Sequence, residues 1–357
     1  MSTHEVLVVK VKEVKPHPNA DLLEIISLEE YGDNYSIISK KGQFSPGDLG
    51  IFIEPDYVVS TDKKEFSFLS DSKKKVRISA KKLRGVWSEG LLIEADKTKH
   101  KQGDNVIEEF EIERYEPELK KSFSEGSELK SGWLVPEPIF AFKYDLENAK
   151  KYFSEVEGKE VYFTTKIHGA NARFVYTNGE FFCGSRTSWK MKPGSIKDFT
   201  NKDGDVIKKE VPSNSWWEAF DQNPWLGEFC KNNPDMVVYG EIYGEKVQGN
   251  KFHYGHKETF GVRIFDILNG KTFVSFDELI NSEKYSVLQK VPVLYKGICD
   301  KKVIEELAEK NEDSLPECGD NHIREGIVIR PVQETYSDRL RGMIKLKWVS
   351  KNYLNKS

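Results

Sequence analysis

The sequence predicts an α+β protein in two parts: an N-terminal β-barrel over residues 1–110 and a mixed α/β domain over residues 136–357, built on antiparallel sheets. The first observation is a succession of short apolar strands separated by Gly, Pro and Asp turns, which is typical of a small barrel. The second is a strand–turn–strand pattern with intervening helices after residue 136. A chain of 357 residues is long enough for about two domains. An acidic, then Ser-, Gly- and Lys-rich stretch over residues 111–135 is predicted to link them.

The composition is that of an ordinary globular protein, with 38% hydrophobic and 31% charged residues. A formal net charge of -4 argues against bulk electrostatic binding of nucleic acid, although the 54 Lys and Arg residues leave room for a local basic groove. The four cysteines are far apart and form no Cys-x-x-Cys motif, which argues against a zinc site or disulfide framework and fits a reducing compartment. Neither a secretory signal nor a membrane-spanning run is found, so we expect a soluble, cytoplasmic protein with no membrane partner.

The N-terminal part contains four predicted strands. They cover Val6–Val11, Leu22–Leu28, Tyr35–Ser39 and Ile51–Ile53. Downstream, Ile78–Gly90 mixes lysines and an arginine with Trp87. Basic grooves with aromatic side chains suit single strands or phosphate backbones. The alternative is a solvated loop with a core tryptophan, and the residues alone leave both open.

The C-terminal part alternates strands with helices. The predicted strands cover Val161–Phe163, Ala172–Tyr176, Phe181–Cys183, Met236–Gly244, Phe260–Leu268, Arg324–Pro331 and Met343–Trp348. Thr177–Glu180 predicts a hairpin turn. The predicted helices cover Asp145–Phe153, Trp216–Cys230 with a break at Pro224, and the amphipathic Lys302–Lys310. Residues 191–212 are rich in Lys, Gly, Asp and Pro and are predicted to form a mobile loop.

The stretch Thr164–Asn171 places a lysine, Lys166, where a buried strand meets a tight glycine turn. Burial disfavours the ammonium form, lowers the pKa of a lysine and makes its amine a usable nucleophile. The alternative is a strand-end lysine that extends into solvent. Other polar residues in this part of the chain favour the interpretation of Lys166 as a nucleophile.

These other residues are an arginine, two strand-associated carboxylates, an aromatic strand and two lysines on the same face of one strand. They are Arg186, Glu241, Glu325, Phe260–Leu268, Lys345 and Lys347. Such a set suits nucleotidyl transfer, because a lysine can attack an α-phosphate while cations neutralise phosphate charge. Carboxylates can hold a divalent metal or a ribose hydroxyl, and an aromatic ring can stack on the base. The sequence contains no Walker loop and no Rossmann glycine fingerprint.

Six short motifs, in this order, resemble those of the covalent nucleotidyltransferase superfamily of polynucleotide ligases and mRNA capping enzymes. They are Lys166–Gly169, Ser185–Thr187, Tyr239–Gly244, Phe265–Ile267, Glu325–Arg330 and Lys345–Lys347. The first has the form typical of RNA ligases. In the N-terminal part, Pro16–Asp21 and the loop Gln43–Gly50 resemble OB-fold tRNA-binding modules.

The two parts together resemble the RNA ligase 5 family. This resemblance implies an OB-like nucleic-acid-binding domain over residues 1–110. It also implies a nucleotidyltransferase domain, of the adenylyltransferase and ATP-grasp-like kind, over residues 136–357. The chain ends soon after Lys347, so the C-terminal OB domain of DNA ligases and capping enzymes is not expected.

The resemblance implies a role for each matching residue. The roles are lysyl-AMP formation at Lys166, α-phosphate binding by Lys345 and Lys347, nucleotide contacts by Arg186 and Glu241, adenine stacking by Phe265, and metal binding by Glu325. Phe260 competes with Phe265 for the stacking role, because the phase of the strand leaves both open. His168 and Asn171 flank the nucleophile and are expected to act mainly after the lysine is adenylated.

Two positions depart from the family pattern. Related RNA ligases usually have Glu before the motif lysine and Thr after the motif glycine, where this chain has Thr165 and Ala170. These differences bear on base contacts or specificity more than on the chemistry of the lysine.

The implied enzyme is an ATP-dependent RNA ligase that uses Mg²⁺ or Mn²⁺. Lys166 attacks ATP and releases pyrophosphate, AMP passes to a 5′-phosphate, and a 3′-hydroxyl displaces AMP and seals the strand. The expected partner is RNA, as a nicked duplex with 3′-hydroxyl and 5′-phosphate ends, and the expected state is a monomer. The alternatives are a catalytically inactive RNA-binding protein and a DNA-ligase or capping-type nucleotidyltransferase. A metal site at His253-x-x-His256 is disfavoured, because the sequence places no third ligand nearby.

Overall fold

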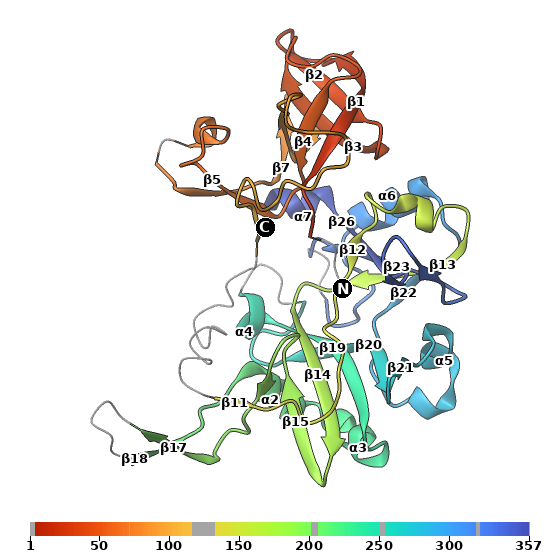
Figure 1. Ribbon diagram of the computed structural model, residues 1–357. Coiled ribbons are helices and arrows are strands. Elements are labelled where there is room, and N and C mark those ends of the chain that lie inside the picture. The colour runs from red at the N-terminus through yellow and green to blue at the C-terminus, as the bar shows by residue number, and fades with distance from the viewer. Residues whose placement is uncertain are drawn as a thin grey trace. The chain divides into compact units, whose positions relative to one another are not determined.

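The computed structural model describes residues 4–70, 72–115, 133–200, 206–249, 254–318 and 322–356 (Figure 1). The chain divides into two compact units. The N-terminal unit comprises Ser2–Pro117, Leu146–Glu155 and Leu346–Ser357, and the central unit comprises Glu118–Asp145 and Val156–Lys345. Most of the predicted linker, residues 116–132, lies outside the described residues. No helix in the described ranges is long and apolar enough to cross a membrane.

The N-terminal unit is built on a five-stranded antiparallel sheet with the strand order β3-β2-β1-β4-β9. Beside it, β5 pairs with β6 and β10, and β7 pairs with β8. The strands are β1 (Leu7–Pro16), β2 (Leu23–Leu28), β3 (Gly32–Lys40), β4 (Leu49–Ile53), β5 (Tyr57–Ser60), β6 (Lys75–Arg77), β7 (Ala80–Leu83), β8 (Val86–Glu89), β9 (Leu91–Glu94), β10 (Glu113–Arg114), β12 (Glu147–Asn148) and β26 (Leu346–Val349). The helices are η1 (Ser67–Leu69), η2 (Phe153–Glu155) and α7 (Lys351–Lys356).

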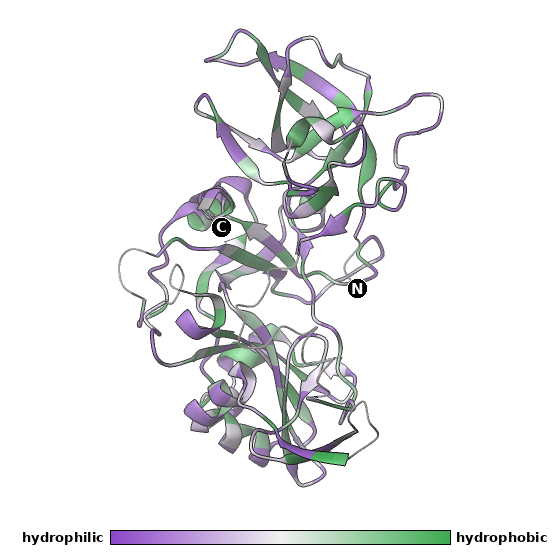
Figure 2. Ribbon diagram, turned by 90° about the vertical axis from the view of Figure 1, so that its left-hand side faces the viewer, coloured by the Kyte–Doolittle hydropathy of each residue, from purple (hydrophilic) through white to green (hydrophobic). Residues whose placement is uncertain are grey.

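Both faces of this sheet are packed. Along β1, Val8 belongs to one buried cluster, whereas Val9 and Val11 belong to another, as the alternation of side chains in a strand requires. On β4, Ile51 and Phe52 divide between the same two clusters. Figure 2 shows hydrophobic colouring along these strands and hydrophilic colouring along the loops that connect them. The predicted all-β character of the N-terminal part is confirmed.

The prediction of a helix over Asp145–Phe153 is wrong. The segment instead forms the short strand β12, which runs parallel to β26, followed by a turn. The backbone N–H of Ala149 donates to the carbonyl of Lys347 at 2.8 Å, and the side chain of Asn148 accepts from the N–H of Lys150 at 3.0 Å. These partners replace the i−4 carbonyls of a helix, and one of them is remote in sequence.

The central unit contains a seven-stranded antiparallel sheet and a second group of strands in which β13 pairs with β22 and β23. The order of the sheet is β11-β16-β15-β14-β19-β20-β21. The strands are β11 (Leu134–Val135), β13 (Glu160–Lys166), β14 (Ala170–Thr177), β15 (Glu180–Gly184), β16 (Trp189–Lys190), β17 (Ile196–Thr200), β18 (Val206–Glu210), β19 (Met236–Tyr243), β20 (Gly261–Asn269), β21 (Thr272–Phe273), β22 (Val293–Ile298), β23 (Gly326–Pro331), β24 (Tyr336–Ser337) and β25 (Gly342–Met343). The helices are α2 (Ser215–Gln222), α3 (Pro224–Asn232), α4 (Glu245–Gln248), α5 (Phe276–Asn281), η4 (Glu283–Tyr285) and α6 (Lys301–Glu309).

Local sequence signals explain several of these elements. Pro224 begins α3 and separates it from α2, because proline lacks the N–H that a continuous helix needs and suits the first helical position. Asn178 and Gly179 adopt φ values of 52° and 83°, which the turn between β14 and β15 requires. The predicted helix break, the hairpin and the amphipathic helix near residue 302 are confirmed.

Residues 191–212 were predicted to form a mobile loop, but they contain a β-hairpin. β17 and β18 pair with each other in antiparallel register, from Ile196 opposite Glu210 to Thr200 opposite Val206. All five residues of β18 are exposed. A strand that buries neither face lacks the alternation of apolar and polar residues that identifies strands in a sequence.

The turn between β13 and β14 requires glycine. A Cβ atom on Gly169 would lie 2.3 Å from the carbonyl oxygen of Ile242 and 2.8 Å from Cγ of Glu241. A Cβ atom on Gly342, by contrast, would approach only the Leu340 carbonyl, at 3.8 Å.

We therefore predict that Gly169→Ala lowers the thermal unfolding temperature by several degrees, because overpacking costs about 1–3 kcal/mol. Differential scanning calorimetry measures the change, with Gly342→Ala as the matched control that should leave the temperature nearly unchanged. Equal unfolding temperatures for the two variants would contradict this account of the turn.

Candidate active site

The antiparallel pairing of β13 with β23 positions Lys166. Lys166 is the last residue of β13 and lies opposite Gly326, so Glu325, which precedes β23, lies beside it. The Lys166 Nζ donates a hydrogen bond to Oε1 of Glu325 at 2.5 Å. The side chains are largely buried, with exposed fractions of 22% and 11%. The pairing thus brings a nucleophile candidate and a carboxylate together inside the fold.

A second carboxylate, Glu241, comes from β19. Glu241 lies opposite Asn171 of β14, and the close approach at Gly169 brings β19 against the turn that follows Lys166. Burial raises the pKa of Glu241 to about 8, Lys166 lowers it in part, and Glu325 raises it further. Glu241 therefore shares one site with Lys166 and Glu325.

His168 and Asn171 flank the same turn. Burial lowers the pKa of His168, and the charge of Lys166 acts in the same direction, whereas Glu325 opposes them. The backbone N–H of His168 donates to the hydroxyl of Tyr254 at 3.1 Å. The carbonyl of Asn171 accepts from Trp216 Nε1 at 3.1 Å, while its side-chain Oδ1 is buried without a hydrogen bond from the described residues. That buried oxygen is available to a ligand.

Lys345 belongs to a separate buried cluster centred on Asp266. The Asp266 carboxylate accepts from Lys345 Nζ at 2.6 Å, Arg330 Nη2 at 2.7 Å and the Tyr144 hydroxyl at 2.5 Å. Burial disfavours the charged carboxylate, but Arg330 and Lys345 outweigh it and lower the pKa of Asp266. Burial likewise lowers the pKa of Lys345, and Asp266 opposes that shift. Asp266 therefore orients the Lys345 ammonium.

The aromatic candidates differ in exposure. Phe260 is buried, with an exposed fraction of 3%. Phe265 is partly exposed and packs against Tyr144, with ring centroids 4.7 Å apart. Of the two, Phe265 is better placed to meet a base.

Two other predicted residues have different neighbours in the structure. Arg186 follows β15 and its Nη1 lies 3.4 Å from Oδ2 of Asp145. Lys347 belongs to the N-terminal unit, where it lies on β26 and lines a pocket with Glu147 and Lys150. The central unit thus brings four of the predicted residues together, Lys166, His168, Glu241 and Glu325, and holds Lys345 on Asp266.

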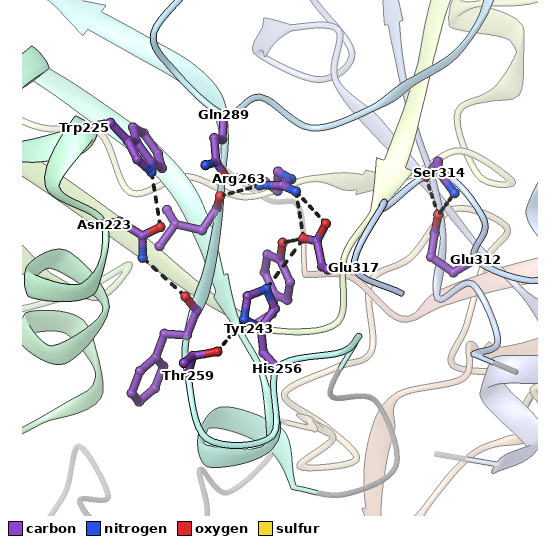
Figure 3. Close-up of polar contacts among 12 residues, drawn as sticks. Asn223, Trp225, Tyr243, His256, Thr259, Arg263, Gln289, Glu312, Ser314 and Glu317 are labelled. Atoms are coloured by element: carbon purple, nitrogen blue, oxygen red, sulfur yellow. Dashed lines mark hydrogen bonds and ion pairs between the residues drawn. The ribbon is translucent and has the colours of Figure 1, made fainter. Parts of the chain in front are cut away.

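Sequence reasoning assigned no role to the residues that support Lys166. Thr165 is buried, and its hydroxyl lies 2.7 Å from that of Ser314. Ser314 donates hydrogen bonds to the carboxylate of Glu312 (Figure 3). The same carboxylate accepts a hydrogen bond from Arg324 at 3.1 Å. Side chains alternate along a strand, so Thr165 faces this support while Lys166 faces the site.

A second network fixes the end of β19. Glu317 accepts hydrogen bonds from the hydroxyl of Tyr243 and from Arg263, the latter at 2.7 and 2.9 Å, and lies 3.6 Å from His256 (Figure 3). His256 also contacts Thr259 at 2.8 Å. His253 lies outside the described residues, so the predicted pair of histidines is not visible together. Asp266, which sequence reasoning also missed as a functional residue, carries the same signal as Glu241: a carboxylate within an apolar strand.

Comparison with known protein families matches both parts of the chain. Residues 159–347 match the family RNA ligase, and residues 6–95 match a family described as an OB-fold domain. The OB-fold match bears out the prediction for the N-terminal part. A search of curated proteins finds no match.

The chain also resembles solved structures of the Naegleria gruberi RNA ligase. A ligand-free variant shares 22% identity at a TM-score of 0.73, over 99% of this chain and 98% of that chain. A variant with AMP and manganese shares 21% identity at a TM-score of 0.74, and one with ATP and manganese shares 21% at 0.72, each over 99% of this chain and 98% of that chain. These likenesses show that the fold is the same. Because the RNA ligase match spans more than half of the sequence, this chain belongs to the RNA ligase family.

Proposed function

We propose that this ligase is ATP-dependent, forms a covalent lysyl-AMP intermediate at Lys166 and seals 5′-phosphate to 3′-hydroxyl ends at nicks in RNA-containing duplexes, as the RNA ligase 5 family does. The observation that carries the proposal is the position of Lys166 at the end of β13, where its Nζ lies 2.5 Å from Oε1 of Glu325. The Naegleria gruberi ligase structures with ATP or AMP and manganese support the same nucleotide and metal here.

In the first step, Lys166 Nζ attacks the α-phosphorus of ATP, a nitrogen–phosphorus bond forms and pyrophosphate leaves. Nζ must lose a proton before it attacks, and Glu325 Oε1 already accepts its hydrogen bond. We assign the nucleotide contacts to the remaining predicted residues. They are Arg186 for the sugar or phosphate, Glu241 for a ribose hydroxyl, Phe265 for adenine, and Lys345 and Lys347 for the α-phosphate.

Glu325 also fits a divalent metal, either Mg²⁺ or Mn²⁺. Its Oε2 is buried and accepts no hydrogen bond from the described residues, so an acceptor position is open beside Lys166. Mg²⁺ is usually held by one or two carboxylates together with substrate phosphates. The described residues contain no group of three or more His, Cys, Asp or Glu side chains that could hold a metal ion without a substrate. A metal ion there would neutralise charge on the transferring phosphate.

In the later steps, the RNA 5′-phosphate takes AMP from Lys166, and the 3′-hydroxyl then attacks that 5′-phosphorus and releases AMP. His168 and Asn171 flank the lysine from which AMP departs. Since the pKa of His168 is lowered, its ring is neutral near pH 7 and can exchange a proton or accept a hydrogen bond there. Asn171 Oδ1 is open for a hydrogen bond from the substrate.

An inactive RNA-binding protein would have no need to retain this arrangement. The charged pair of Lys166 and Glu325 is largely buried, and Glu241 is desolvated beside it. Removing such charges from water costs free energy that a binding surface does not require. The arrangement therefore supports a catalytic site.

We predict that Lys166→Ala abolishes covalent labelling by α-phosphate-labelled ATP while the protein remains folded. The reason is that Lys166 Nζ is the proposed nucleophile, and it is the amine that donates a hydrogen bond to Oε1 of Glu325. A denaturing gel after incubation with Mn²⁺ or Mg²⁺ measures the label. The matched control is Lys296→Ala, which removes a half-exposed lysine from β22, the strand next to β13, and should label like the wild type.

Retained labelling of Lys166→Ala would place the nucleophile elsewhere. Wild-type protein that takes no label after pretreatment with pyrophosphate, which removes AMP already bound, would favour the inactive RNA-binding protein.

The pKa of Glu241 predicts a pH-dependent stability. Folding raises the pKa from 4.5 to about 8, so the folded state binds the proton more tightly than the unfolded state. The stability therefore falls as pH rises through this window. In the Glu241→Gln variant this side chain cannot ionise. The unfolding temperature of the variant should therefore rise by a few degrees relative to that of the wild type as the pH increases from 5 to 8. Calorimetry across this range measures the gap, and a gap that stays constant would contradict the assigned pKa.

We predict that the lysines of the β7–β8 hairpin in the N-terminal unit bind RNA. Lys81 and Lys82 are exposed, and Lys82 Nζ lies 6.0 Å from the centroid of the Trp87 ring. Reversing both charges should weaken binding of a nicked RNA duplex about tenfold at low salt, because phosphate contacts dominate affinity. Self-adenylation should be unchanged.

Fluorescence anisotropy measures the affinity. Lys12→Glu/Lys15→Glu makes the same charge change on β1 and serves as the control, with a much smaller expected effect. The same loss in both double variants would indicate a general charge effect and would argue against a specific role for the hairpin.

A further inference from the structure

We propose that residues 312–317 form a strap that positions the reacting groups for the transfer of AMP to Lys166. Three polar side chains of the strap each bind a residue that lies one or two positions from a predicted site residue. These side chains are Glu312, Ser314 and Glu317. The proposal rests on the proposed function, because it takes the transfer of AMP as the reaction. The three residues are assigned no contact with ATP, so they are positioning residues.

Ser314 holds the residue before Lys166. Its hydroxyl lies 2.7 Å from that of Thr165, whose side chain is buried. The Ser314 N–H in turn donates to the carboxylate of Glu312 at 3.0 Å, which fixes Ser314 within the strap. Lys166 is the last residue of β13 to pair with β23, so the ladder continues on only one side of it. A restraint at Thr165 therefore limits the movement of the backbone that carries Nζ.

Glu312 holds the residue before Glu325. Its carboxylate accepts a hydrogen bond from Arg324 Nε at 3.1 Å, and both side chains have an exposed fraction of only 1%. Arg324 also donates to the carbonyl of Leu307 at 2.7 Å and to Asp313 at 2.8 Å. Taking two charges out of water costs free energy, so a buried ion pair adds little net stability although it holds its partners in one geometry. A role in positioning Glu325 accounts for that cost.

Glu317 holds the end of β19. It accepts hydrogen bonds from the hydroxyl of Tyr243 and from Arg263 (Figure 3). Tyr243 lies two residues after Glu241 on the same strand. A Cβ atom on Gly255 would lie 1.9 Å from the carbonyl oxygen of Glu317, so the strap is packed closely at this end. The strap thus restrains the strand that carries Glu241.

The strap connects β13, β19 and the residue that precedes β23. It is itself held in place, because the N–H of Glu312 donates to the carbonyl of His322 at 2.8 Å and Leu315 has an exposed fraction of 1%. Attack on a phosphorus atom is sensitive to position, and a misplacement of about 1 Å can lower a rate about 100-fold. Loosening the strap at Thr165 should therefore slow the transfer of AMP without changing the affinity for ATP.

Two variants of Thr165 give a matched test. Thr165→Val keeps the branched shape of the side chain and removes the hydroxyl, whereas Thr165→Ser keeps a hydroxyl. The rate of labelling by α-phosphate-labelled ATP is measured in a single turnover, as a function of ATP concentration. We expect Thr165→Val to lower the rate at saturating ATP about tenfold and to leave the half-saturating ATP concentration within about twofold of that of the wild type. Thr165→Ser should label at nearly the wild-type rate.

Ser314→Ala removes the hydroxyl on the other side of the same contact and should lower the rate by about the same factor. Because the two hydroxyls act as a unit, the double variant should be no slower than either single variant. If Thr165→Val does not fold, Ser314→Ala takes its place, since Ser314 is only partly buried.

Thr177→Val is the control for a loss of stability alone. Thr177 is also a buried strand residue, and its hydroxyl donates to Asp235 at 2.6 Å. It lies at the opposite end of β14 from the turn that follows Lys166. Thr177→Val should lower the unfolding temperature, as measured by calorimetry, and leave the labelling rate unchanged.

An unchanged labelling rate in both Thr165→Val and Ser314→Ala would overturn the strap. A comparable loss of rate in Thr177→Val, or slow labelling by Thr165→Ser, would also overturn it, because the rate would then follow stability. A raised half-saturating ATP concentration at an unchanged maximal rate in Thr165→Val would assign Thr165 to ATP binding and contradict a positioning role.

Tyr243→Phe tests the contact at Glu317. It removes the hydroxyl that binds Glu317 and leaves the ring. Because Glu241 is assigned to a ribose hydroxyl, we expect the half-saturating ATP concentration to rise about threefold. An unchanged concentration would overturn the part of the proposal that concerns Glu317.

The wild-type protein separates this proposal from the proposed function. Failure of the wild type to take up AMP after pretreatment with pyrophosphate would overturn the proposed function itself. Normal labelling of the wild type, with no slowing in Thr165→Val or Ser314→Ala, would overturn only the strap.

Discussion

The backbone ladder between β13 and β23 holds Lys166 against Glu325, and the rest of the site depends on that contact. The pairing of Lys166 with Gly326 fixes where the two side chains meet. Glu241 then reaches the same site only because Gly169 lets β19 approach the turn after Lys166. A buried charged group is stable when its neighbours compensate it, so the three groups must be understood together. Burial raises the pKa of Glu241, Lys166 lowers it in part, and Glu325 raises it further.

The hydrogen bonds of Thr165 give a physical explanation for the unusual residue before Lys166. Thr165 stands where related RNA ligases usually have Glu, and its hydroxyl contacts Ser314. Through Glu312 this contact continues to Arg324, the residue before Glu325. Thr165 and Arg324, which precede Lys166 and Glu325 in the sequence, are thus connected by hydrogen bonds on the buried side of the strands. Thr165 acts here as a positioning residue for Lys166, and it faces away from the site.

Much of this organisation could be predicted from the sequence, for identifiable reasons. The apolar runs around Val161 and Val237 predict strands, and their side chains are buried in the structure. Pro224 predicts a helix break because proline lacks a backbone N–H, and it begins α3. The contact between Lys166 and Glu325 spans 159 residues, and no local pattern predicts it, so only the ordered motifs indicated it. The segment after Asp145 was mistaken for a helix because its hydrogen-bond partner, Lys347, lies far along the chain. The β17–β18 hairpin was missed because neither of its faces gives an apolar pattern.

The account depends most directly on the identity of the nucleophile. The wild-type protein would be incubated with ATP and Mn²⁺, digested, and its peptides mapped by mass spectrometry for the added mass of one AMP. The account predicts a single adenylated peptide in which Lys166 carries the AMP through a nitrogen–phosphorus bond. AMP found on another residue, with Lys166 unmodified, would contradict it.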